Sequence, residues 1–330
     1  MSTIFDIAKR ANVSVMTVSR VFNNPDIVSD KTIKKIHKIM DDLGYQPSQI
    51  ARSLKKKQTN TIGVIMPDIK NTFFNSWFRY VEDYASSHNY NLLLCNTDEE
   101  PARELKYIKL LHSQRVDGIL VVPHSKKSIE YLQKTTIPFI SVDRVFEELE
   151  TNYVTTDHYR GAFIAVEHLI KLGHKNIAIL KGPGAIYPDI QRLSGTLDAF
   201  KNNSLKPDAS LFLNCEFDEA KAYKSVLQLF RHRNNPTAIF TFNSLMMSGA
   251  IKALRVLKKS VPGDVSLICF DEIPGYEIFQ PKITCISQPV PELGTESIKL
   301  LIEKIKRPKL PVKKILLKPK LVRGDSCKRI

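Results

Sequence analysis

Between residues 61 and 290, polar or aromatic residues stand just after a series of short apolar runs. Carboxylate, amide and guanidinium groups form paired hydrogen bonds with vicinal hydroxyls, and aromatic rings cover the apolar face of a sugar. We therefore expect these residues to bind one small, polyhydroxylated ligand. The candidate residues after these runs are Asp68, Asn71, Phe73, Phe74, Asn96, Asp98, Pro123, His124, Asp143, Arg144, Gly182, Pro183, Arg192, Asn243, Ser244, Asp271 and Gln288.

Each of these residues also has a purely structural interpretation. An aspartate after a strand often caps the next helix, and Phe73 with Phe74 could belong to the core. The convergence of several loops favours a binding site over these separate explanations.

Enzyme motifs are missing from the sequence. There is no GxGxxG, GxSxG, GxxxxGK[ST] or HExxH, and the eight histidines show no metal-ligand spacing. A Rossmann-type dehydrogenase, the enzyme alternative, would lack its dinucleotide turn. We therefore expect no catalytic residue, no cofactor and no metal.

The elements that position the predicted ligand residues are apolar strands alternating with helices of 12–16 residues. Such a pattern predicts parallel sheets covered on both faces, and two series of it predict two doubly wound α/β lobes. In this architecture ligands bind beyond the carboxyl ends of the strands. Apolar runs occur at 62–66, 90–95, 116–122, 137–142, 177–180, 238–242 and 265–270.

The first sixty residues have a different, all-α pattern. Apolar spacing predicts a helix from Ile4 to Ala11, a second after Ser14 up to Phe22, and a third that Gly44 ends. Two short helices and a closing third form a helix-turn-helix unit, whose second helix would meet base edges in the major groove. A generic three-helix bundle is the structural alternative. The predicted DNA-contacting residues of this unit are Ser14, Val15, Met16, Thr17, Ser19 and Arg20.

The same residues carry a resemblance to the lactose/galactose repressor (LacI) family. It rests on residues 3–8 (T-I-F-D-I-A), 11–21 (A-N-V-S-V-M-T-V-S-R-V), 43–47 (L-G-Y-Q-P) and 50–54 (I-A-R-S-L). It continues through residues 63–74, 115–119, 168–174, 236–240, 261–266 and 288–289.

The resemblance implies a headpiece at 1–46, a hinge helix and linker at 47–60, and a regulatory core at 61–330 that is similar to periplasmic sugar-binding proteins. In the hinge, Leu54 would be an apolar wedge in the minor groove, and Arg52 and Lys55 would lie near phosphates or the groove floor. The N-lobe would comprise about 61–158 and 291–316, and the C-lobe about 161–287 and 320–330. The chain would cross between lobes near 158–161, 287–291 and 316–320.

The implied function is a ligand-controlled repressor that binds palindromic operator DNA as a homodimer. By the resemblance, eight of the candidates match positions that hold a monosaccharide and are the predicted ligand residues: Phe73, Phe74, Asp143, Arg144, Arg192, Asn243, Asp271 and Gln288. The family also contains a purine-responsive member, so a purine or another metabolite stays open as the effector. A secreted solute-binding protein is a further alternative, and the sequence does not show whether a phosphocarrier protein acts as a co-regulator.

Charge and composition fit this interpretation. The chain has 330 residues and a formal charge of +15, concentrated at +6 in residues 1–60 and +10 in residues 299–330, with about −1 between them. A basic end points to nucleic acid as partner, although the basic segment 299–330 is equally explained as a solvated surface. No apolar run spans a membrane, no signal segment opens the sequence, and five widely spaced cysteines predict reduced thiols in the cytoplasm.

Overall fold

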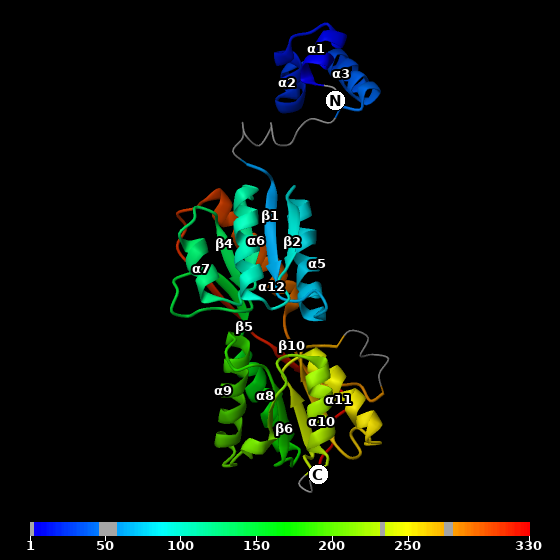
Figure 1. Ribbon diagram of the computed structural model, residues 1–330, viewed down its shortest axis with the longest axis vertical. Coiled ribbons are helices and arrows are strands. Elements are labelled where there is room, and N and C mark those ends of the chain that lie inside the picture. The colour runs from blue at the N-terminus through cyan, green and yellow to red at the C-terminus, as the bar shows by residue number, and fades with distance from the viewer. Residues whose placement is uncertain (1–2, 46–57, 232–234, 274–279) are drawn as a thin grey trace. The chain divides into compact units, whose positions relative to one another are not determined.

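The computed structural model describes residues 3–45, 58–231, 235–273 and 280–330 (Figure 1). The chain divides into two compact units, residues 1–59 and 60–330. Three residues predicted to contact DNA through the hinge, Arg52, Leu54 and Lys55, lie outside the described residues. No helix in the described ranges is long and apolar enough to span a membrane.

The first unit is a three-helix bundle. Its helices are α1 (Ile4–Ala11), α2 (Val15–Asn23) and α3 (Asp30–Leu43), with a 3₁₀ turn at Pro25–Ile27. Each helix begins at a hydroxyl cap, formed by Thr3, Ser14 and Ser29, whose side chain accepts a backbone N–H. Gly44 ends α3 with a φ of 58°, a left-handed conformation that favours glycine. The predicted helices are confirmed, with Ile7, Ala11, Val18 and Ile36 fully buried between them.

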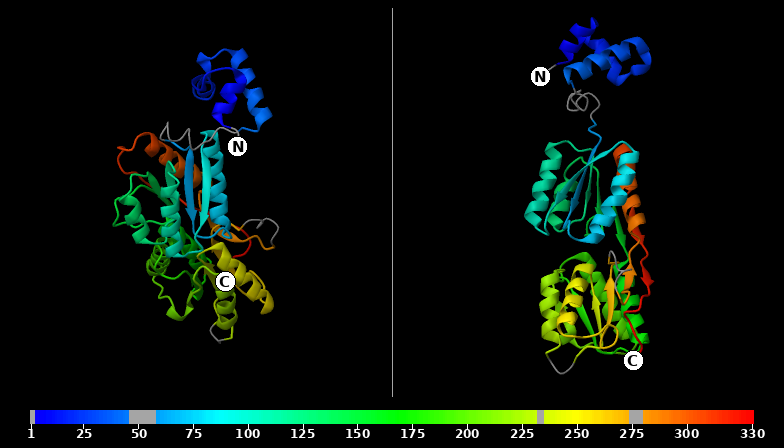
Figure 2. Two further views of the ribbon diagram at one scale, coloured as in Figure 1. Left: turned by 45° about the horizontal axis from the view of Figure 1, so that its top comes forward. Right: turned by 90° about the vertical axis from the view of Figure 1, so that its right-hand side faces the viewer.

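The N-lobe of the second unit is a parallel sheet with strand order β11-β5-β4-β3-β1-β2. Its strands are β1 (Thr61–Met66), β2 (Asn91–Asn96), β3 (Gly118–Val121), β4 (Phe139–Val142), β5 (Tyr153–Thr156) and β11 (Lys314–Leu317). Its helices are α5 (Thr72–Ser87), α6 (Pro101–Ser113), α7 (Lys126–Gln133) and α12 (Val290–Lys306). Helices α5 and α12 cover one face, and α6 and α7 cover the other (Figure 2).

The C-lobe repeats this plan with strand order β12-β10-β9-β8-β6-β7. Its strands are β6 (Ile177–Lys181), β7 (Phe212–Asn214), β8 (Ala238–Thr241), β9 (Ser266–Phe270), β10 (Thr284–Ser287) and β12 (Lys320–Val322). Its helices are α8 (His158–Lys171), α9 (Tyr187–Asn202), α10 (Glu219–Leu229) and α11 (Ser244–Val256), with a 3₁₀ turn at Ala209–Leu211. The two-lobed α/β architecture is therefore as predicted, except that edge strand β12 pairs antiparallel with β10.

The chain passes between the lobes three times, at Asp157, at residues 288–289 and at residues 318–319. The first passage comes before the predicted 158–161, because α8 already begins at His158 and packs against α9 of the C-lobe. The other two passages fall inside their predicted ranges. As a result α12 and β11, from late in the chain, complete the N-lobe.

The two sheets share one internal strand order, so β4 corresponds to β9 and β2 to β7. The residue after β4 is Asp143, and the residue after β9 is Asp271; their φ angles are 63° and 89°. Glu99 after β2 and Phe217 after β7 also have positive φ, at 59° and 57°. Non-glycine residues with such backbone are uncommon and gather at functional sites, which places four candidates at matching strand ends.

Candidate ligand-binding cavity and nucleic-acid-binding helix

A cavity of about 430 Å³ lies between the carboxyl ends of the two sheets, a size suited to a small molecule. Seven of the eight predicted ligand residues line it together. They are Phe73, Phe74, Asp143, Arg144, Arg192, Asn243 and Asp271. The eighth, Gln288, lines a neighbouring cavity of about 530 Å³ that shares Phe73 and Asp271 with the first.

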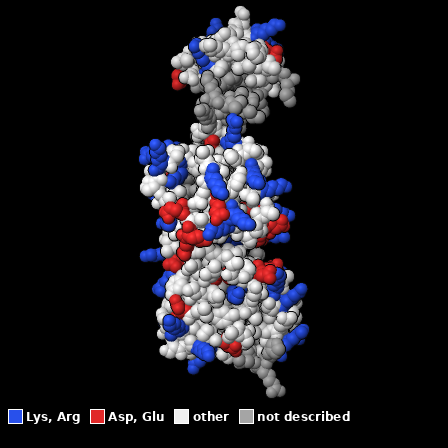
Figure 3. All heavy atoms as spheres, turned by 60° about the vertical axis from the view of Figure 1, so that its left-hand side comes forward, with Lys and Arg blue, Asp and Glu red and all other residues white. Residues whose placement is uncertain are grey.

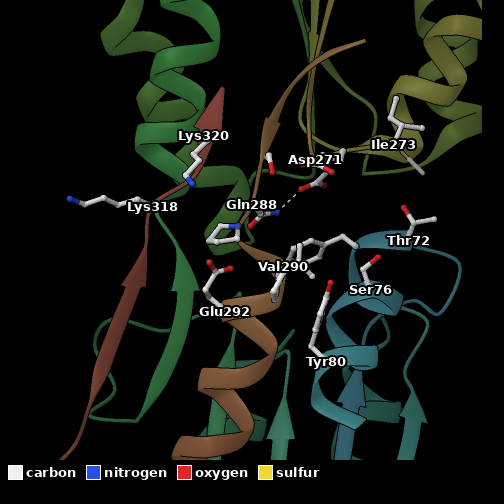
Figure 4. Close-up of a pocket in the computed structure, with 15 residues that line it drawn as sticks. Thr72, Ser76, Tyr80, Asp271, Ile273, Gln288, Val290, Glu292, Lys318 and Lys320 are labelled. Atoms are coloured by element: carbon white, nitrogen blue, oxygen red, sulfur yellow. Dashed lines mark hydrogen bonds between the residues drawn. The ribbon is translucent and has the colours of Figure 1, made fainter. Parts of the chain in front are cut away.

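Gln288 reaches the first cavity through Asp271. Its Nε2 donates a hydrogen bond of 2.5 Å to Asp271 Oδ1, the dashed line in Figure 4. Asp271 is 5% exposed, and its burial raises the pKa of its carboxyl to about 6 although Arg192 and Gln288 act in the opposite direction. Gln288 therefore orients the carboxylate and leaves its other oxygen for a ligand.

Arg192 crosses the floor of the C-lobe side of the cavity. One terminal nitrogen donates to the Phe242 carbonyl, and the other lies 3.2 Å from His158 Nδ1. The guanidinium carbon lies 3.7 Å from the centre of the Phe270 ring, a cation–π distance. These contacts fix the plane of the guanidinium. They leave Nε as its one nitrogen without a hydrogen-bond partner among the described residues.

Arg144 is held by a residue that the sequence analysis did not single out. Its two terminal nitrogens donate to the two carboxylate oxygens of Glu99 over 2.7 and 2.6 Å. Burial opposes ionisation of Glu99, but the Arg144 charge outweighs it and lowers the pKa of Glu99 to about 2. Glu99 stands in the acidic run 98–100 before α6, where sequence pattern alone suggests a helix start.

Several buried polar atoms at this site have no hydrogen-bond partner among the described residues. They are Asp143 Oδ1, Arg144 Nε, Arg192 Nε and, in the neighbouring cavity, Gln288 Oε1. Asp143 Oδ1 lies 3.2 Å from His158 Nε2, but without hydrogen-bond geometry. Because buried polar atoms are nearly always paired, two free donors and two free acceptors indicate a ligand that both donates and accepts.

The aromatic pair serves both the core and the cavity. Phe73 and Phe74 are 8% and 4% exposed, stack edge-to-face with centroids 5.1 Å apart, and belong to the N-lobe core. Asn243 caps α11 through Oδ1, which accepts from Met246 N over 2.9 Å. The structural and binding interpretations of these residues are thus compatible. Phe217, also in the lining, follows β7, a strand that sequence reasoning missed.

In the first unit, α2 exposes part of the predicted DNA-contacting set. Met16 is 64% exposed, and Ser14 and Arg20 are exposed as well. Val15 packs partly against the bundle core, and Thr17 and Ser19 are half-buried. Ser14 Oγ accepts from Thr17 N over 3.0 Å, so Ser14 is engaged as a cap. The exposed face of α2 is therefore centred on Met16 and Arg20.

Comparison with known proteins decides the family. Residues 3–48 match "Bacterial regulatory proteins, lacI family", and residues 166–327 match "Periplasmic binding protein-like domain". The chain is 34% identical over 326 residues to the HTH-type transcriptional regulator DegA of Bacillus subtilis (strain 168), covering 97% of this chain and 96% of that protein. This chain belongs to the LacI family. Members of the family are DNA-binding transcription regulators and not enzymes.

Two further relatives of this LacI-family chain are named as repressors. The ribose operon repressor of Halalkalibacterium halodurans is 34% identical, covering 99% of this chain and 98% of the relative. The HTH-type transcriptional repressor PurR of Actinobacillus pleuropneumoniae serotype 3 (strain JL03) is 33% identical, covering 93% of this chain and 92% of the relative.

Among solved structures, the lac repressor dimer bound to operator and an anti-inducer superposes with a TM-score of 0.88 at 26% identity, covering 99% of both chains. A LacI family regulator from Enterococcus faecium with bound ribose gives 0.75 at 30%, covering 82% of this chain and 99% of that one.

Proposed function

We propose that this LacI-family chain is a repressor of sugar-metabolism genes whose operator affinity is controlled by a neutral monosaccharide or a close derivative. The observation that carries the sugar assignment is the set of unpartnered donors and acceptors around the cavity of about 430 Å³ and the cavity that adjoins it. Hydroxyl groups both donate and accept, and the Phe73–Phe74 pair offers an apolar wall for a sugar face. The relative named as a ribose operon repressor and the solved family member with bound ribose support the same assignment.

The DNA-binding assignment rests on α2 and the predicted hinge. Arg20 is exposed for a guanine edge, and Met16 for a thymine methyl. A homodimer supplies the two headpieces that a palindromic operator needs. The N-lobe offers a surface for the second copy, because edge strand β2 leaves Leu93 and Leu94 39% and 38% exposed.

Effector control follows from a cavity whose walls belong to both lobes. A ligand that bonds Asp143 and Asp271 at once stabilises one separation of the lobes over others, and this differential binding shifts the equilibrium between operator-binding states. The experiment determines whether the ligand weakens or strengthens operator binding.

Titration of ligand into the protein tests the function. Thermal unfolding with D-ribose, other monosaccharides, hypoxanthine and guanine should show a raised melting temperature with a sugar, because a ligand of the native state stabilises it. The same sugar should change anisotropy titrations with a palindromic operator fragment. A melting temperature raised by hypoxanthine or guanine and by no sugar would contradict the sugar assignment and support a purine effector.

Effector affinity should depend on pH through Asp271. The ionised carboxylate accepts hydroxyl hydrogen bonds, and its pKa of about 6 means that its ionised fraction rises about tenfold from pH 5 to pH 7. We therefore expect affinity to rise by up to about tenfold over that interval, measured by isothermal calorimetry. A flat profile in the wild type would contradict a role for the carboxylate.

Leu54→Ala should weaken operator binding by about tenfold or more and reduce DNA bending, because an apolar wedge holds a kinked base step open. Anisotropy gives the affinity, and energy transfer between dyes at the operator ends gives the bend. Leu54→Met is the matched control, since methionine retains an apolar wedge. Equal affinity and bending for the alanine variant would exclude the wedge.

A further inference from the structure

The charges around the ligand cavity are unequal. Seven carboxyl groups line it, against one lysine and two arginines. On the face shown in Figure 3, acidic side chains gather along the junction of the two lobes. Two rim carboxylates, Glu216 and Glu219, are compensated by Lys221 and Lys252. The deeper carboxyls Asp143 and Asp271 lie near the two arginines, and Asp143 Oδ1 also lies 3.2 Å from His158 Nε2.

Neither arginine is available as an anion receptor. Both terminal nitrogens of Arg144 are bound by Glu99, and the Arg144 side chain is only 6% exposed. Arg192 donates to the Phe242 carbonyl and stacks on Phe270. Each keeps a single unpartnered Nε, which is enough for one hydroxyl oxygen. A phosphate or carboxylate is bound best by the two-pronged face of the guanidinium, and Glu99 already occupies that face on Arg144.

The geometry points to Glu99 as a specificity-determining residue that excludes phosphorylated and carboxylated effectors by occupying Arg144. This inference rests on the proposed function, since it assumes that the cavity holds a sugar. An anionic ligand would have to displace Glu99 from a two-bond ion pair and then lie among the remaining carboxylates. A neutral sugar needs only the single donors and acceptors that the pair leaves open. The backbone of Glu99, with φ of 59°, directs its carboxylate to this position.

The test compares matched neutral and anionic sugars. Melting temperature and calorimetric affinity are measured with D-ribose against D-ribose 5-phosphate and D-glucose against D-glucose 6-phosphate. The wild type should prefer the neutral member of its cognate pair by at least a hundredfold. Glu99→Gln keeps the size of the side chain but removes the charge, so it should narrow that preference by tenfold or more, mainly through tighter binding of the phosphate.

Glu100→Gln is the matched control, because Glu100 is an adjacent carboxylate outside the cavity lining; it should keep the wild-type preference. Operator binding by Glu99→Gln verifies that this variant folds. A wild type that binds the phosphate as well as the sugar, or a Glu99→Gln preference equal to that of the wild type, overturns the role of Glu99 and leaves the repressor function standing. If no sugar of either kind binds, the sugar assignment itself fails.

Discussion

Asp271→Asn should abolish most of the effector response and leave operator binding near the wild-type level. The Asp271 carboxylate is 5% exposed, oriented by Gln288 and aimed at the cavity with an oxygen left for the ligand. Losing one buried, charge-assisted interaction costs about 2 kcal/mol or more. We therefore expect effector affinity to fall at least about 30-fold. Calorimetry with the cognate sugar and operator anisotropy with and without it measure both quantities.

Glu272→Gln is a matched control for Asp271→Asn. Glu272 is the next residue, is exposed, and lines only the neighbouring cavity. The Glu272→Gln variant should respond to the sugar as the wild type does. An Asp271→Asn variant that retains the full effector response would remove Asp271 from the binding site, and equal losses in both variants would point to a disturbance of the β9 end.

Trp77→Ala should destabilise the N-lobe by about 3–5 kcal/mol, the range for removing a large aromatic side chain from a core. Trp77 is fully buried, and its indole Nε1 donates to Ser297 Oγ over 3.2 Å, which joins α5 to α12. Urea unfolding followed by circular dichroism, in the absence of ligand and DNA, measures the change in the free energy of unfolding.

Trp77→Phe separates packing from the hydrogen bond. It retains an aromatic ring and loses the indole donor, so we expect a smaller loss of about 1–2 kcal/mol. A loss below about 1 kcal/mol for Trp77→Ala would mean that the contact of α5 with α12 is not an important part of the N-lobe core.

The features that the sequence predicted well have strong local causes. The three headpiece helices begin at hydroxyl caps, and the long strands are continuous apolar runs such as 62–66 and 266–270. Strands β5, β7, β10 and β11 were missed because polar residues leave each of them an apolar run of only one to three residues.

The gathering of seven predicted ligand residues around one cavity was predictable, because parallel strands deliver their following loops to one edge of the sheet. The partners of those residues were not. Glu99 meets Arg144 across 45 positions in sequence, and nothing in local pattern specifies such a pair. Gln288 was predicted as a direct ligand residue, yet it contacts Asp271 from the neighbouring cavity. A direct contact of Gln288 with the effector stays a prediction.

The three passages between lobes have a consequence for synthesis on the ribosome. The three headpiece helices are complete once residue 45 has left the ribosome, so the headpiece can fold early in synthesis. The N-lobe begins at residue 60, but its core needs Leu293 and Leu301 of α12, and its sheet needs β11. The apolar strands of the N-lobe therefore remain partly exposed while residues 158–287 of the C-lobe are synthesised. Nascent chains should accordingly engage chaperones over this interval, and truncation before α12 should yield aggregation-prone fragments.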